Sequence, residues 1–135
     1  MHAPPPPPSR RRVLVVDDDE LVRNALGRLL RQRGGAEVLL AEGSGRAREL
    51  LGEGPVDVVV SDHSMQGETG MSLLAAVAER HPGVVLVMFS ALPPPEASRA
   101  VAEGRLAGLF RKPHEAAALV DFVRRAIAPP GGDGG

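Results

Sequence analysis

The chain has 135 residues, of which 43% are apolar and 24% charged, as is typical of one soluble globular domain. The absence of Cys excludes disulfides, zinc–thiolate centres, iron–sulfur clusters and thiol nucleophiles. A net charge of −1 and the absence of Trp and Tyr argue against a basic field or aromatic platforms that would bind nucleic acid directly. Because no bilayer-spanning apolar stretch or secretory signal is visible, we expect a cytoplasmic location and no membrane contact.

The two ends of the chain differ in composition from its middle. Residues 1–11 contain a run of prolines followed by arginines, and residues 129–135 are rich in proline and glycine. Neither composition favours helix, sheet or a packed core. We therefore predict a disordered arm over residues 1–11, one folded domain over 12–128 and a flexible tail over 129–135. The folded part, about 117 residues long, is too short for an additional output domain.

Short apolar runs predict the strands. Three of these runs are apolar at every position rather than at every second one, which is typical of strands buried on both faces of a parallel sheet. In chain order, the predicted strands are residues 13–16, 37–41, 58–60, 84–89 and 107–110.

The segments between the strands have helical periodicity. The first predicted helix has apolar residues spaced three and four apart from Val22 to Leu29, and it ends at Gly34 and Gly35. The other predicted helices run from Ser44, as the N-cap, to Leu51, over residues 70–80, over residues 95–103 and through the segment 116–127. Five strands that alternate with five helices through short connections predict an α/β fold. Right-handed crossovers then give one doubly wound parallel sheet with helices on both faces.

Polar residues stand where the predicted strands end, which is where open parallel sheets bind their ligands. Lys112 is the single lysine among 16 basic residues, which favours a specific role for a compact ammonium group. In chain order, the polar residues at the strand ends are Asp17, Asp18, Asp62, Ser90 and Lys112.

The acidic residues predict a magnesium site. Asp17, Asp18 and Asp62 would meet at one edge of the sheet, where three carboxylates repel one another unless a cation neutralises them. Oxygen ligands without His or Cys favour Mg²⁺. An alternative for an acidic run is that it stabilises the positive end of the first helix. We adopt this interpretation for Asp19, as the N-cap, and for Glu20.

Asp62 is the candidate nucleophile. It follows a buried strand and opens a loop that contains Gly67 and Gly70, so we expect its side chain to be rigidly held yet open to solvent. A fixed carboxylate beside Mg²⁺ and the Lys112 ammonium is placed to attack phosphorus, because the cations neutralise charge on the phosphoryl oxygens. Ser90 could donate a hydrogen bond to the phosphoryl group, with a role in a turn as the alternative.

Four segments together resemble the receiver domain of bacterial two-component response regulators. They are Val13–Asp19, Val59–Met65, Val87–Ala91 and Phe110–Pro113, and the resemblance extends over nearly the whole folded part. It implies a flavodoxin-like fold with strand order 2-1-3-4-5, the order of the chemotaxis receiver. It also implies a phosphorelay signalling switch without a separate catalytic domain.

The resemblance implies a role for each candidate residue. Asp62 would accept a phosphoryl group from a sensor histidine kinase or phosphotransfer protein. Asp17 (through water), Asp18, Asp62 and the backbone carbonyl of Ser64 would hold Mg²⁺. A downstream protein would bind the face made by the fourth helix, the fifth strand and the fifth helix. The remaining site residues are Lys112 and Ser90, which would contact the phosphoryl group, Leu109 at the switch position, and Gly70 and Pro113 in structural roles, with a cis Lys112–Pro113 bond.

The sequence departs from the family pattern at two positions. Gln66 stands where many receivers have proline, so the loop after Asp62 loses one fixed φ angle. Leu109 stands where the family often has an aromatic residue. These departures keep open a binding module that works without phosphorylation. A second alternative is a Mg²⁺-dependent phosphatase of the haloacid dehalogenase type, with Asp17 as nucleophile and Asp19 as acid and base, but no later acidic pair or cap segment supports it.

Overall fold

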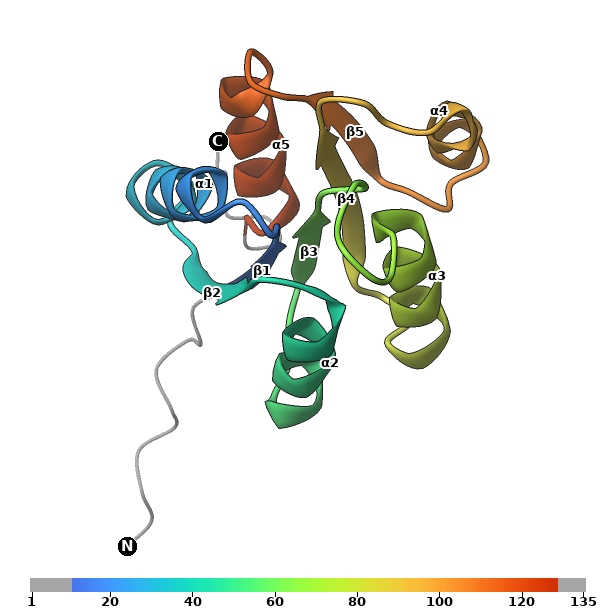
Figure 1. The fold of residues 1–135 in the computed structure, drawn as a ribbon. Helices are drawn as coiled ribbons and strands as arrows, with labels where there is room; N and C mark the ends of the chain where they lie inside the picture. Colours follow the sequence, from blue (N-terminus) through green and yellow to red (C-terminus); the bar gives the residue numbers. More distant parts are fainter. Residues whose placement is uncertain (1–10, 129–135) are drawn as a thin grey trace, which may run out of the picture.

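The computed structural model describes residues 11–128, and the predicted arm and tail lie almost wholly outside them. Five parallel strands form one sheet in the order β2-β1-β3-β4-β5, with five helices around it (Figure 1). This confirms the predicted flavodoxin-like fold and strand order. The strands are β1 (Arg12–Val16), β2 (Glu37–Ala41), β3 (Val58–Ser61), β4 (Val85–Ser90) and β5 (Gly108–Arg111). The helices are α1 (Glu20–Gln32), α2 (Ser44–Glu53), α3 (Gly70–Arg80), α4 (Pro95–Ala102) and α5 (Ala116–Ala126).

The sheet separates two hydrophobic cores. Helices α1 and α5 cover one face, and α2, α3 and α4 cover the other (Figure 1). Successive residues of a strand point to opposite faces, so Leu14 joins the core under α2, α3 and α4 while Val13 and Val15 join the core under α1 and α5. Both faces of the strand are therefore apolar, which is the physical reason for the continuous apolar runs in the sequence.

The parallel register brings the ends of neighbouring strands to one level. Val16, the last residue of β1, pairs with Ala41 of β2 on one side and with Ser61 of β3 on the other. The sheet hydrogen bonds continue one residue further, from Asp17 N to Ala41 O at 3.1 Å and from Asp62 N to Val16 O at 3.0 Å. Asp17 and Asp62, far apart in the sequence, are consequently neighbours at the edge of the sheet.

Of the two predicted helix N-caps, one is confirmed and the other is wrong. Asp19 is the N-cap of α1 as predicted, and its carboxylate accepts hydrogen bonds from two backbone amides of the first turn. The prediction that Ser44 caps α2 is wrong: the helix begins at Ser44 itself, and the N-cap residue is Gly43, which has no side chain to donate or accept.

The remaining boundaries agree with the predicted ones to within two residues, the largest shift being the end of α2 at Glu53 instead of Leu51. Within residues 11–128, none of the helices combines the length and the apolar character that crossing a membrane requires.

Candidate functional site

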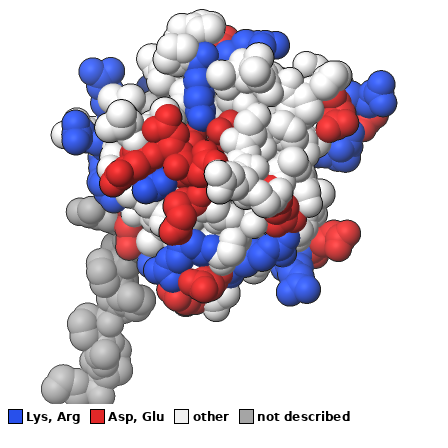
Figure 2. All heavy atoms as spheres, viewed as in Figure 1, with Lys and Arg blue, Asp and Glu red and all other residues white. Residues whose placement is uncertain are grey.

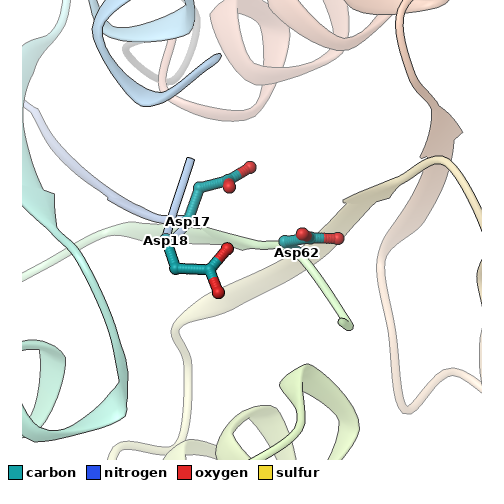
Figure 3. Close-up of side chains that lie close together, drawn as sticks. All are labelled: Asp17, Asp18 and Asp62. Atoms are coloured by element: carbon teal, nitrogen blue, oxygen red, sulfur yellow. The ribbon is translucent and has the colours of Figure 1, made fainter. Parts of the chain in front are cut away.

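Three carboxylates converge where β1 and β3 end (Figure 3). Asp17 and Asp18 extend from β1 and Asp62 from β3, and one oxygen of each carboxylate lies within 4.8 Å of the others. Asp17 and Asp62 are buried, whereas Asp18 is exposed. Acidic side chains gather left of the centre of the face shown in Figure 2. The structure thus brings together the three carboxylates that the sequence analysis selected.

Lys112 extends from the end of β5 and places its ammonium group between two of these carboxylates. Lys112 Nζ lies 2.6 Å from Asp17 Oδ2 and 3.2 Å from Asp62 Oδ2. It also lies 5.9 Å from the centroid of the Phe89 ring. Lys112 therefore contacts two of the three carboxylates, and Asp18 forms no ion pair within residues 11–128.

Backbone amides orient all three carboxylates. Each aspartate accepts one hydrogen bond from the backbone, so the side chains are held by the loops that follow β1 and β3. The three hydrogen bonds run from Asp19 N to Asp17 Oδ1 at 2.9 Å, from His63 N to Asp62 Oδ1 at 2.7 Å and from Gln66 N to Asp18 Oδ2 at 3.3 Å.

The environment raises the pKa of both partners in the buried ion pair. For Asp17, burial raises the pKa, and the hydrogen bonds from Lys112 and Asp19 offset this only in part. For Lys112, burial acts to lower the pKa, but the hydrogen bond to Asp17 and the charges of Asp17 and Asp62 together outweigh it. Burial thus opposes the charge of both groups, and only for Lys112 do the neighbouring charges outweigh it.

The expectation that Asp62 is open to solvent is wrong, because the residue is only 8% exposed. Lys112 reaches across from β5 and covers Oδ2, while the His63 amide occupies Oδ1. These two contacts do hold the carboxylate in a defined orientation. Both oxygens of Asp62 are therefore engaged, and little of the residue is exposed.

Ser90, at the end of β4, is completely buried, and its Oγ has no hydrogen-bond partner within residues 11–128. Its backbone takes part in the sheet edge, since Lys112 N donates to Ser90 O at 3.2 Å. A buried hydroxyl without a partner destabilises the fold by about 1–3 kcal/mol. Within residues 11–128 the side chain makes no hydrogen bond in a turn, so the alternative of a turn role has no support.

Gly70 and Pro113 occupy constrained positions beside the site. A Cβ at Gly70 would lie 2.0 Å from Asp62 O, and the Gly70 amide donates to His63 O at 2.9 Å. Only glycine allows α3 to start this close to the loop that follows Asp62. The Lys112–Pro113 peptide bond is cis, as expected from the resemblance.

The other two candidates are Leu109, in β5, and Ser64, in the loop that follows β3. Leu109 of β5 is partly buried and packs against the core under α2, α3 and α4. Ser64 is exposed in the loop after β3. The sequence analysis missed Arg23, whose Nη1 donates to Asp17 O at 2.8 Å, because nothing in the sequence separates this arginine from the others of α1.

The chain belongs to the response regulator receiver domain family, whose pattern it matches over residues 13–124. It resembles the hydrogenase transcriptional regulatory protein HoxA of Cupriavidus necator, with 35% identity over 97 residues, which are 70% of this chain and 20% of that protein. The chain thus spans about one fifth of the length of this curated relative.

Solved structures of receiver domains have the same fold. The signal receiver domain of an HD domain-containing protein from Pseudomonas fluorescens has 25% identity and a TM-score of 0.79, over 87% of this chain and 94% of that one. The chemotaxis protein CheY4 of Vibrio cholerae has 24% identity and a TM-score of 0.76, over 87% and 99% of the two chains.

The protein is therefore a receiver domain of the two-component signalling type. Receiver domains bind Mg²⁺ at an acidic pocket and interact with histidine kinases or phosphotransfer proteins, and they are generally not separate enzymes. The cluster of Asp17, Asp18 and Asp62 lies where that pocket is expected.

Proposed function

We propose that Asp62 accepts a phosphoryl group from the phosphohistidine of a sensor histidine kinase or phosphotransfer protein, in a Mg²⁺-dependent reaction. The supporting observation is that the Asp62 carboxylate lies within 4.8 Å of Asp17 and Asp18 and 3.2 Å from the Lys112 ammonium. We assign this activity to a receiver domain over residues 12–128.

The donor set fits Mg²⁺. It would consist of the side chains of Asp17 (through water), Asp18 and Asp62 together with the backbone carbonyl of Ser64. All of these are hard oxygen donors, and the three carboxylates outnumber the one ammonium group that contacts them, which suits a divalent cation. When bound, Mg²⁺ neutralises charge on the phosphoryl oxygens.

The contacts of the two Asp62 oxygens favour one of them as the nucleophile. Oδ1 accepts from His63 N at 2.7 Å, whereas Oδ2 faces Lys112. We assign Oδ2 as the nucleophile: it forms the new P–O bond while the P–N bond of the donor breaks, and the imidazole nitrogen leaves with the electron pair. Lys112 moves from Oδ2 to the phosphoryl oxygens and keeps its contact with Asp17.

Ser90 connects the phosphoryl group to the output surface. Its buried hydroxyl lacks a partner within the described residues, so it has a hydrogen bond to offer to a phosphoryl oxygen. Because Ser90 ends β4, its movement would shift the segment that leads into α4. Leu109, which packs on the α4 side of the sheet, would respond, and a downstream protein would bind the face formed by α4, β5 and α5.

The test is phosphorylation by acetyl phosphate and by candidate kinases, with the modified residue mapped by mass spectrometry. Asp62→Asn abolishes the Mg²⁺-dependent label. Asp57→Asn, the same change at the opposite end of the sheet, retains it. Undiminished labelling of Asp62→Asn refutes the acceptor assignment. Label on Asp17 would support the phosphatase alternative, and a wild-type protein that never labels would support a binding module.

A further inference from the structure

Among the described residues, the backbone of the loop over residues 63–69 is hydrogen-bonded mainly at its two ends, at His63 and Thr69. The loop contains Ser64, a proposed Mg²⁺ ligand, and Gln66, whose amide donates to Asp18 Oδ2 at 3.3 Å. Gln66 is not a proline, and Gly67 has a φ of 83°, in the region that only glycine adopts readily. The position of the loop therefore depends on contacts made by its side chains.

Glu68 makes the strongest of these contacts. Arg48 of α2 donates from Nη2 to both carboxylate oxygens of Glu68, at 2.7 Å each, and Ser72 of α3 donates from Oγ to Oε2 at 2.7 Å. The hydrogen bonds from Arg48 and Ser72 lower the pKa of Glu68, so the carboxylate is ionised at neutral pH. In Figure 1 the start of α2 lies beside the loop that leads into α3.

We propose that Arg48 and Glu68 are positioning residues that hold the loop 63–69 in the conformation that binds Mg²⁺. The tether runs from α2 through Arg48 and Glu68 to the loop, and from the loop through the Gln66 amide to Asp18. This inference rests on the proposed function, because it takes Asp18 and Ser64 as Mg²⁺ ligands. The ion pair between Arg48 and Glu68 would thus fix the loop in a chain that has Gln66 where many receivers have a proline.

The direction in which Arg48→Gln changes the affinity for Mg²⁺ distinguishes a positioning role of Arg48 from a purely electrostatic one. Removing a positive charge near a negative site strengthens Mg²⁺ binding if only the Coulomb interaction matters. Loss of the tether weakens binding, because the loop must then be ordered when the ion binds. The second effect is expected to dominate, with a rise in the dissociation constant of about 3- to 10-fold, below the 10- to 100-fold of direct outer-shell partners of a metal site.

Arg46→Gln is the matched control. Arg46 lies on the same helix, makes its ion pairs within that helix, with Glu49 and Glu53, and has no hydrogen bond or ion pair with the loop 63–69 in the part of the chain that the structure describes. The change in net charge is identical in the two variants. The dissociation constant for Mg²⁺ is measured by calorimetry, and amide hydrogen exchange is measured in the metal-free protein.

Arg48→Gln is expected to weaken Mg²⁺ binding and to speed exchange of the amides of residues 66–70, while Arg46→Gln does neither. At saturating Mg²⁺ the maximal rate of Asp62 labelling stays within about twofold, since no group that touches the phosphoryl oxygens changes. Unchanged or tighter Mg²⁺ binding in Arg48→Gln, or an equal loss in Arg46→Gln, overturns the inference. A wild-type protein that binds no Mg²⁺ overturns the proposed function itself, so the two failures are distinguishable.

Discussion

Charged side chains are paired differently at the two ends of the sheet. At the amino end, Arg11 pairs with Asp57 at 3.3 Å and Arg12 with Glu37 at 3.4 Å, and these side chains are between 31% and 48% exposed. Each positive charge has its own negative partner. Exposed pairs of this kind contribute about 0–1 kcal/mol, so this end of the sheet depends little on them.

At the carboxyl end, the two buried carboxylates of Asp17 and Asp62 share the one ammonium of Lys112, with the exposed Asp18 beside them, and the buried hydroxyl of Ser90 has no partner within the described residues. Burying unbalanced charge and an unpaired hydroxyl opposes folding. Residues that stability alone would not favour are therefore concentrated at the carboxyl end of the sheet. Under the proposed function, a cation and a phosphoryl group would complete the interactions of these residues.

The largest expected effect comes from removing the charge of Lys112. Lys112→Met leaves Asp17 and Asp62 buried without a counter-charge and is expected to lower the free energy of unfolding of the metal-free protein by about 3 kcal/mol. Arg12→Met, at the amino end, is expected to lower it by less than about 1 kcal/mol. Urea unfolding measures both values, and equal losses would contradict the comparison.

Gly70→Ala is expected to have the next largest effect. The added methyl group would lie 2.0 Å from Asp62 O, so the loop or α3 must shift, with a loss of about 2 kcal/mol. Gly45→Ala in α2 meets no atom within 4 Å and is expected to stabilise the helix by about 0.5–1 kcal/mol. Thermal unfolding compares the two, and a tolerated Gly70→Ala would show that α3 does not need this close approach.

Mg²⁺ is expected to stabilise the protein through the carboxyl end alone. At ten times the dissociation constant, the ion adds about 1.4 kcal/mol to the free energy of unfolding. Asp18→Asn removes most of this gain, whereas Asp57→Asn at the amino end leaves it intact. The measurement is the shift in the unfolding midpoint between chelator and Mg²⁺, and a shift that survives in Asp18→Asn would place the ion elsewhere.

The smallest expected effect is the pH dependence contributed by Glu68. Its pKa is lowered by Arg48 and Ser72, so it contributes stability above the unfolded value near 4.5 and loses it as the pH falls through the folded pKa. The advantage of wild type over Glu68→Gln is expected to be below about 1 kcal/mol at pH 7 and to disappear in acid. Urea titrations at a series of pH values test this, and an advantage that grows in acid would reverse the assigned sign.

Local sequence patterns predicted the fold and most of the candidate cluster. Continuous apolar runs marked the strands because both faces of the sheet are covered, and the residues after them had to meet at one edge because the strands are parallel. The predicted cap at Ser44 is wrong because α2 begins one residue earlier than expected, with Ser44 in its first turn and Gly43 at the N-cap position. The capping preference of serine alone does not fix at which residue the helix begins.

The sequence by itself determined the order of strands and helices and the types of side chain at each strand end, since both follow from the apolar spacing along the chain. Only the tertiary structure decided that Lys112 covers Asp62, that Ser90 is buried without a partner in the described residues, and that Arg48 reaches the loop after β3. These features depend on distances between elements that are remote in sequence. Such distances are set by how the helices pack on the sheet, which no local pattern encodes.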